Sequence, residues 1–223
     1  MNIFFLYSQP RQQWFKAVNR HTMPNHVLYG ASLMPKSCKT TITDLGFSRW
    51  NLLRFLSSPI QRIFLKKYGV GFQIDQIIPI IGKLNAADVI ISTNDSCGLP
   101  LSWLKKIGII KTPLVYCHIN FSHTDKLIEN LLAQPEKLVS FSSPHNLPPG
   151  VDVAFFRPRQ SKETVDVFSV GRDIHRDYIS LILASSRLNL STKIICDPKN
   201  ILGVPIPDNV MVKFNQNYSA VRE

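Results

Sequence analysis

The sequence predicts an α/β fold made of two successive units, each an alternation of strands and helices. Three observations support this prediction. Short apolar runs alternate with segments whose apolar residues recur every three or four positions, a pattern typical of parallel sheets covered by helices. A proline-rich stretch at 144–158 separates two series of such elements. The second series, at 165–223, offers three strand candidates, fewer than a complete α/β unit of this kind needs to cover its sheet.

The first unit is assigned to residues 1–143 and has the elements of a complete Rossmann-like domain. Its continuous apolar run at 88–92 is typical of a parallel strand covered on both faces. The polar stretch at 33–48 lacks periodicity and predicts a loop. Strands are expected at 2–7, 26–29, 88–92, 114–119 and 138–141, and helices at 12–20, 49–68 with an interruption at Pro59, 73–84 with a break near Pro79, 99–107 and 125–133.

A linker at 144–164 leads to the second unit, 165–223, which corresponds to the first part of another Rossmann-like domain. A strand at 165–170 ends at Gly171 and is followed by a helix that runs to Leu188. Two more strands are expected at 193–196 and 210–213, and the last residues, 219–223, predict the first turn of a helix.

The turn after the strand at 165–170 is the strongest candidate for a functional site. A strand that stops at a glycine and feeds a helix leaves unpaired backbone N–H groups that converge on one spot, with the positive end of the helix dipole behind them. Arg172 and Arg176 add guanidinium groups, so Gly171, Arg172 and Arg176 predict a diphosphate-binding site. The alternative is a solvated basic helix start, in which Asp173 and Asp177 pair with the arginines.

The same turn also carries a resemblance to a known family. GVDxxFFxP, starting at Gly150, and SVGRxxxRDY, containing Gly171, Arg172 and Arg176, resemble the hinge and the opening strand of the second domain in retaining GT-B glycosyltransferases of the "glycosyl transferases group 1" kind. The resemblance implies a GT-B-like fold and transfer of a hexose from a nucleotide-diphosphate sugar to an acceptor hydroxyl, commonly of a lipid-linked or envelope glycan. It also implies a donor held between the two domains, with no metal and no other cofactor.

Site residues are carried over one by one from this resemblance. Arg172 matches the family's motif arginine, and Arg176 lies near a position where the family commonly has lysine. A histidine often follows the strand that corresponds to 114–119, which implies that His118 contacts the donor sugar. His123 is an alternative for this role, and a strand-end histidine satisfied by neighbouring backbone is the structural interpretation of His118.

The sequence departs from the family in two places. The first strand is followed by Ser8-Gln9-Pro10-Arg11 in place of a Gly-Gly loop, so Arg11 is a candidate substitute for phosphate contact. The acidic Glu-x7-Glu pair of the family's second domain has no counterpart. We expect from this a fragment, a truncated gene or completion by a partner chain, and the alternative function is therefore a non-catalytic fragment or binding subunit.

Two polar residues follow the strand at 88–92 and are candidates for the acceptor side. Asp95 and Ser96 stand at the carboxyl end of a predicted strand, where open α/β sheets place their ligands. The alternative interpretation, which the residue types favour, is that Asp95 caps a helix that starts near Gly98.

Charge is concentrated in the first part of the chain. The net charge is +11, and residues 1–70 contain ten lysines and arginines against a single acidic residue, Asp44. The segment 49–68 combines an apolar stripe with Arg49, Arg54, Arg62, Lys66 and Lys67. This combination suits peripheral contact with an anionic membrane at its inner face, and the alternative is a core-packing helix with a solvated charged face. No nucleic-acid module is present, so specific nucleic-acid binding is not expected.

The remaining features suggest a cytoplasmic protein. The four cysteines lie far apart and form no metal-binding pattern, which is typical of free thiols in a reducing compartment. The first residues lack the basic n-region of a signal peptide, and no apolar run is long enough to span a bilayer.

Overall fold

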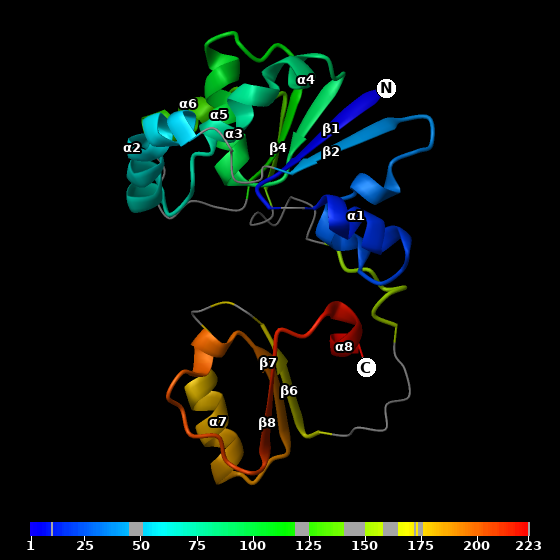
Figure 1. The fold of residues 1–223 in the computed structure, drawn as a ribbon, viewed down its shortest axis with the longest axis vertical. Coiled ribbons are helices and arrows are strands. Elements are labelled where there is room, and N and C mark those ends of the chain that lie inside the picture. Colours follow the sequence, from blue (N-terminus) through cyan, green and yellow to red (C-terminus); the bar gives the residue numbers. More distant parts are fainter. Residues whose placement is uncertain are drawn as a thin grey trace. The chain divides into compact units, whose positions relative to one another are not determined.

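A computed structural model describes residues 1–9, 11–44, 51–118, 125–140, 150–157, 165–171, 173 and 176–222. The chain divides into two compact units, Met1–Asp152 and Val153–Glu223 (Figure 1), and each is described by itself. The division falls inside the range 144–164 that the sequence marks as a linker.

The first unit is built on a parallel sheet of five strands. In chain order the strands are β1 (Asn2–Tyr7), β2 (Lys39–Asp44), β3 (Val89–Ser92), β4 (Leu114–His118) and β5 (Lys137–Ser140). Their order in the sheet is β2-β1-β3-β4-β5, and every neighbouring pair is parallel. All five strands therefore end at the same edge of the sheet, which is where an open α/β sheet presents its ligand-binding residues.

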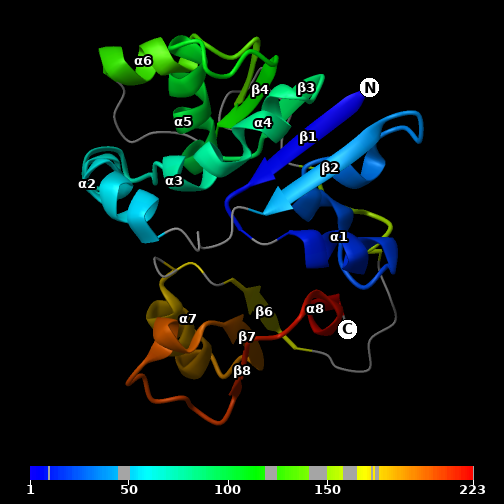
Figure 2. The same cartoon turned by 45° about the horizontal axis from the view of Figure 1, so that its top comes forward.

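Helices cover this sheet and carry most of the side chains that complete its core. α5 packs on β3 and β4 and contacts α3 and α6, whereas α1 packs beside β2 (Figures 1 and 2). The break that Pro79 predicts is confirmed, because α3 passes through a 3₁₀ turn into α4, but Pro59 lies inside a continuous α2. The helical elements are α1 (Gln12–Asn19), η1 (Asn25–Leu28), η2 (Ala31–Leu33), α2 (Asn51–Tyr68), α3 (Ile74–Ile77), η3 (Ile78–Ile80), α4 (Ile81–Asn85), α5 (Asp95–Lys106) and α6 (Lys126–Leu132).

Two further sequence predictions in the first unit, a strand and a loop, are wrong. The strand expected at 26–29 is the 3₁₀ turn η1, since Tyr29 and Gly30 both take positive φ angles, 49° and 86°, and turn the chain away. The loop expected at 33–48 contains β2, which pairs with β1 along its full length. The three threonines of β2 supply the β-branched side chains that suit an edge strand despite their polarity.

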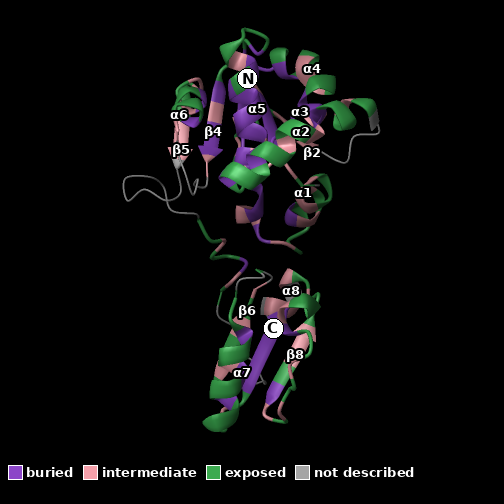
Figure 3. Cartoon of the chain, turned by 90° about the vertical axis from the view of Figure 1, so that its left-hand side faces the viewer, coloured by how far each residue is buried: buried purple, intermediate pink, exposed green. Residues whose placement is uncertain are grey.

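The second unit contains a smaller parallel sheet. β6 (Val167–Val170), β7 (Thr192–Cys196) and β8 (Val210–Phe214) lie in the order β6-β7-β8. The central strand β7 is buried along its whole length (Figure 3). One face of the sheet packs against α7 (Tyr178–Arg187) and η4 (Pro198–Ile201), and α8 (Tyr218–Arg222) follows near the end of the chain. Parallel strand–helix alternation in both units confirms the α/β fold class.

Helix α2 packs against the rest of the first unit through one narrow stripe of side chains. Phe64 is buried, and its ring centroid lies 4.4 Å from that of Phe72 and 5.3 Å from that of Tyr68. Gln61 donates from Nε2 to Oδ1 of Asp75 at 2.8 Å. Leu56, Ile60 and Ile63, which belong to the apolar stripe noted in the sequence of this helix, are exposed. The core-packing interpretation of this helix is therefore wrong for most of its apolar side chains.

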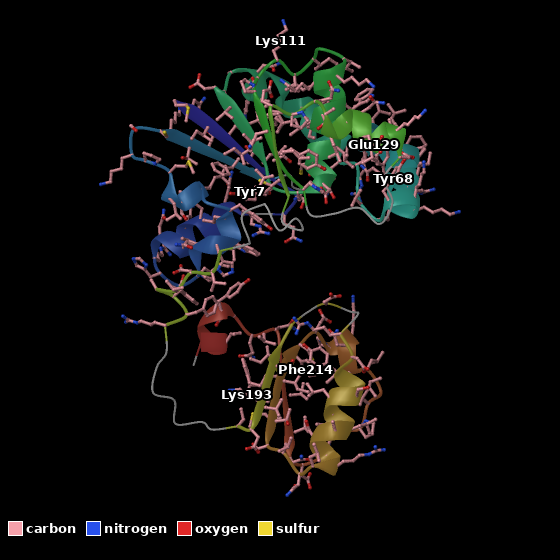
Figure 4. All side chains as sticks on the ribbon, turned by 180° about the vertical axis from the view of Figure 1, so that it is seen from behind. Tyr7, Tyr68, Lys111, Glu129, Lys193 and Phe214 are labelled. Atoms are coloured by element: carbon pink, nitrogen blue, oxygen red, sulfur yellow. The ribbon has the colours of Figure 1, made fainter. Side chains whose placement is uncertain are left out.

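The carboxylate of Asp125 joins the end of α2 to the start of α6. It pairs with the ammonium of Lys67, accepts a 2.7 Å hydrogen bond from the Tyr68 hydroxyl, and caps α6 by accepting from the N–H groups of Leu127 and Ile128 (Figure 4 labels Tyr68). The hydrogen bond from Lys67, followed by that from Tyr68, lowers the pKa of Asp125 below its ordinary value of 3.8.

This junction predicts a pH-dependent contribution to stability. Because the folded-state pKa of Asp125 is depressed, the unfolded chain binds its proton more readily, so the contribution is present above the ordinary value of 3.8 and is lost as pH falls towards the folded-state pKa. Asp125→Asn should lower the urea midpoint at neutral pH, and the difference from the wild type should shrink as pH drops below about 4. Urea denaturation at a series of pH values checks this. A difference of the same size at every pH would contradict it.

Candidate functional site

The turn between β6 and α7 holds the described part of the predicted diphosphate site. The N–H of Gly171 donates to the carbonyl of Ile195 at 2.9 Å, and the Tyr178 hydroxyl donates to the carbonyl of Gly171 at 3.0 Å. The side chain of Arg176 folds back over Gly171. A methyl group placed on Gly171 would lie 2.4 Å from Nε and 2.5 Å from Cζ of Arg176. A side chain at position 171 would therefore displace the exposed guanidinium of Arg176 from this place.

Arg176 is thus placed at the carboxyl end of β6, next to the start of α7, as the sequence predicted for a cation of the site. The residue is exposed, and its guanidinium is available to solvent-borne anions. Arg172, the other arginine of the prediction, lies outside the described residues, and its assignment stays a prediction.

The backbone N–H groups at the start of α7 do not form the open anion site that the sequence suggested. The N–H of Arg176 donates to the carbonyl of Asp173, and the N–H of Tyr178 donates to the carbonyl of Arg176. Asp177 caps the helix: its carboxylate accepts from the N–H and the hydroxyl of Ser180 at 3.0 and 2.7 Å. These hydrogen bonds lower the pKa of Asp177. These amides are therefore not open to a bound anion.

At the carboxyl edge of the first sheet, Asn94 caps α5 and Asp95 does not. The Asn94 side chain accepts from the N–H of Cys97 at 3.1 Å and donates to Oγ of Ser8 at 2.5 Å, which connects the ends of β3 and β1. The helix begins at Asp95, earlier than the start near Gly98 that the sequence predicted. Asparagine and aspartate cap helices about equally well, so the two neighbouring residues could not be told apart by type.

Asp95 is buried and belongs to a packed polar contact. Its Oδ1 accepts a 2.9 Å hydrogen bond from the hydroxyl of Tyr116, whose ring lies against Gly98. Burial, followed by the charge of Asp95, raises the pKa of the Tyr116 hydroxyl well above its ordinary range. Tyr116 therefore stays protonated and donates to the carboxylate. The sequence did not single out Asn94, which follows the end of β3, or Tyr116, which lies in the middle of β4.

His118 ends β4 and lies on the same face of the sheet as Tyr116, since side chains alternate along a strand. The two ring centroids are 6.4 Å apart with the planes at 73°, an edge-to-face arrangement. His118 is half-buried and pairs in register with Ser140 of β5. The structure thus brings Asp95, Tyr116 and His118 together in one region, whereas His123 lies outside the described residues.

Ser96 and Arg11 are the other predicted site residues near this edge. Ser96 is half-buried, and its Oγ would lie 3.0 Å from a methyl group placed on Gly71. The Arg11 guanidinium donates to the carbonyl of Val27 and stacks over the ring of Trp14, with 4.2 Å between Cζ and the ring centroid. This guanidinium is engaged with the protein, so it is not a free substitute for a phosphate loop.

Among the described residues, no cluster of histidine, cysteine, aspartate or glutamate is arranged to hold a metal ion. Nor does any helix in the described ranges combine the length and apolar composition needed to cross a bilayer.

No family model matches this chain, and no curated protein matches its sequence. Among solved structures, it is similar to the crystal structure of glycosyltransferase VinC in complex with dTDP, with a TM-score of 0.44, 9% identity and coverage of 96% of this chain and 71% of that chain. It is also similar to the glycosyltransferase SnogD from Streptomyces nogalater, with a TM-score of 0.40, 13% identity and coverage of 96% and 72%. Both likenesses are remote, and the function proposed below rests on the residues of this chain.

Proposed function

We propose that this protein is a glycosyltransferase of the retaining GT-B kind that its motifs resemble, and that it moves a hexose from a nucleotide-diphosphate sugar to an acceptor hydroxyl. The observation that supports this most directly is the guanidinium of Arg176 held over Gly171 at the end of β6. Arg172, one residue after that glycine, supplies a second positive charge to the same turn.

Departure of the nucleoside diphosphate is favoured by a fixed positive charge such as a guanidinium. The bond between the anomeric carbon and the diphosphate oxygen breaks, and its electron pair leaves with the nucleoside diphosphate. A fixed guanidinium stabilises the negative charge that develops on that oxygen, and its planar donors match phosphate oxygens. The acceptor oxygen bonds to the anomeric carbon, and its proton passes to the departing diphosphate oxygen. On this proposal the arginines do the work that a metal ion does in other transferases.

The first unit supplies the remaining proposed roles. His118 stands at the carboxyl end of β4, where a ligand-contacting side chain is expected, and we assign it to the donor sugar. Asp95 is buried and bonded to Tyr116, which supports a structural role for it and leaves Ser96 as the proposed acceptor-side residue. The proposed acceptor is a lipid-linked or envelope glycan, reached from the cytoplasmic face of a membrane through the basic side chains of 49–67.

The donor proposal is tested by the affinity of the full chain for nucleoside diphosphates and their sugars, measured by calorimetry and thermal shift. Arg176→Ala should weaken binding about tenfold or more, the loss expected for a hydrogen bond to a charged group. Gly171→Ala should weaken it by a smaller factor, because its methyl group displaces the same guanidinium but leaves its charge in the turn. Arg172→Ala should have an effect of the same order.

Arg187→Ala is the matched control, since Arg187 is an exposed arginine at the opposite end of α7. It should bind as the wild type does. If no nucleotide binds the wild-type chain, or if Arg187→Ala weakens binding as much as Arg176→Ala, the proposed donor site is wrong. Donor binding without sugar transfer to any acceptor would favour the alternative of a non-catalytic binding subunit.

A further inference from the structure

Helix α2 presents to solvent the apolar side chains that a surface helix normally buries. The side chains of α2 that pack against the rest of the unit recur three and four residues apart and occupy one stripe. They are Ser57, Gln61, Phe64 and Tyr68. The side chains on the rest of the helix surface have no such burial. The exposed fraction is 76% for Phe55, 68% for Leu52, 61% for Leu56, 60% for Ile63 and 44% for Ile60.

We call these five residues, Leu52, Phe55, Leu56, Ile60 and Ile63, the outward stripe of α2. They are also spaced three and four residues apart, so they form a continuous apolar strip along the helix. Exposed apolar residues scattered singly need no explanation, but a contiguous strip on one helix marks an interaction surface.

The charge of α2 identifies the partner. Arg54, Arg62, Lys66 and Lys67 lie in this helix, and residues 51–68 contain no acidic residue. A second copy of the chain would meet the stripe through the same patch on both molecules, which would set these basic helices against each other. An anionic lipid surface instead satisfies both features, since it takes the apolar side chains into its acyl boundary and the cations into its headgroups.

We propose that α2 is a membrane-docking helix that lies in the plane of an anionic bilayer surface, with the outward stripe inserted among the acyl chains and with Arg62 and Lys66 at the headgroups. The proposal refines the peripheral contact named under the proposed function, because it assigns the attachment to apolar insertion as well as to charge. The junction of Lys67 and Tyr68 with Asp125, together with the buried Phe64, holds the helix so that this stripe faces outwards.

Sedimentation of the full chain with lipid vesicles tests this, and no nucleotide is added. The wild type should pellet with phosphatidylglycerol–phosphatidylcholine vesicles and stay in solution with phosphatidylcholine alone. Phe55→Gln/Ile63→Gln should lower the partition coefficient by about tenfold or more, because two large apolar side chains no longer insert. Arg62→Gln/Lys66→Gln should lower it on the order of tenfold.

Each double variant has a matched control. Leu33→Gln/Leu202→Gln removes two apolar side chains that are 67% and 87% exposed elsewhere on the chain. Lys83→Gln/Lys111→Gln removes two exposed lysines outside α2, and Figure 4 places Lys111 at the amino ends of the strands, away from Tyr7. Both controls should pellet like the wild type, and a loss of binding equal to that of the α2 variants would overturn the proposal.

Insertion of the outward stripe into the bilayer is measured by tryptophan fluorescence. A tryptophan introduced as Phe55→Trp should be quenched by lipids brominated on their acyl chains, whereas one introduced as Leu202→Trp should not be. Absence of quenching at position 55 would overturn the insertion. So would a vesicle-free dimer that Phe55→Gln/Ile63→Gln dissociates, because the stripe would then be a contact between copies of the chain. Since none of these measurements involves a sugar donor, they can succeed or fail independently of the glycosyltransferase assignment.

Discussion

Replacing Gly98 with alanine is expected to destabilise the first unit by about 3 kcal/mol or more, at the upper end of what overpacking a core costs. A methyl group on Gly98 would lie 2.1 Å from Cε2 and 2.4 Å from Cζ of the Tyr116 ring. The ring cannot retreat easily, because Tyr116 is fully buried and its hydroxyl is tied to the buried carboxylate of Asp95. Either the ring or the backbone of α5 has to move.

Urea denaturation followed by tryptophan fluorescence measures this effect, since Trp14, Trp50 and Trp103 all precede Asp152 and report on the first unit. Gly82→Ala is the control. Gly82 also lies in a helix, α4, but nothing stands within 4 Å of a methyl group placed on it. Its replacement should be neutral or stabilising by up to about 1 kcal/mol. Equal midpoints for the two variants would contradict a tight contact between Gly98 and the Tyr116 ring.

Truncating Phe64 to alanine should cost about 3–5 kcal/mol, the usual range for a large aromatic side chain removed from a core. Phe64 is the main apolar anchor of α2, and it packs against both Phe72 and Tyr68. Its loss leaves a cavity under the helix that its neighbours Ile60 and Ile63 cannot fill, because both are exposed on the other side of α2. The same fluorescence-monitored denaturation quantifies the cost.

Phe55→Ala provides the comparison, because it makes the same chemical change on the same helix at a side chain that is 76% exposed. It should change the stability by no more than about 0.5 kcal/mol, as is usual for surface positions. The pair of variants thus determines which side of α2 faces the core. A large loss for Phe55→Ala with little effect for Phe64→Ala would reverse the orientation on which the membrane proposal depends.

Most of the fold could be predicted because local patterns and tertiary structure agree. The apolar runs that became β1 and β7 are buried along most or all of their length, and those that became β3 and β4 are partly buried, each inside one of the two parallel sheets. A continuous apolar sequence is what burial on both faces of such a sheet requires. The strand β2 was not predicted, because it is stabilised by its pairing with β1 and its own sequence is not hydrophobic. The orientation of α2 was not predicted for a related reason. Periodicity favours burial of the most apolar stripe of this helix, whereas the buried stripe contains Ser57 and Gln61 and is selected by its contacts with Phe72, Asp75 and Asp125.

The candidate site was predictable where it depends on chain order and less so where it depends on packing. Gly171 and Arg176 stand where a strand–glycine–helix pattern places them, and the clearance that Gly171 gives Arg176 agrees with the motif. That Asp177 would cap α7 in place of a bound anion depends on side-chain geometry, which the pattern does not specify. Likewise, the sequence favoured Asp95 as a helix cap, whereas the structure shows it as a buried partner of Tyr116. Local sequence could not predict this contact, because the Tyr116 hydroxyl comes from a strand about twenty residues away along the chain.

The strand orders of the two sheets have a consequence for how this polypeptide matures during translation. β1 lies between β2 and β3, so its residues pair with Lys39–Asp44 on one side and with Val89–Ser92 on the other. The first strand therefore leaves the ribosome long before its second neighbour exists, and its apolar surface stays open to chaperones in that interval. The strands β6, β7 and β8 lie side by side in the order of synthesis, so the second sheet can assemble strand by strand as the chain emerges.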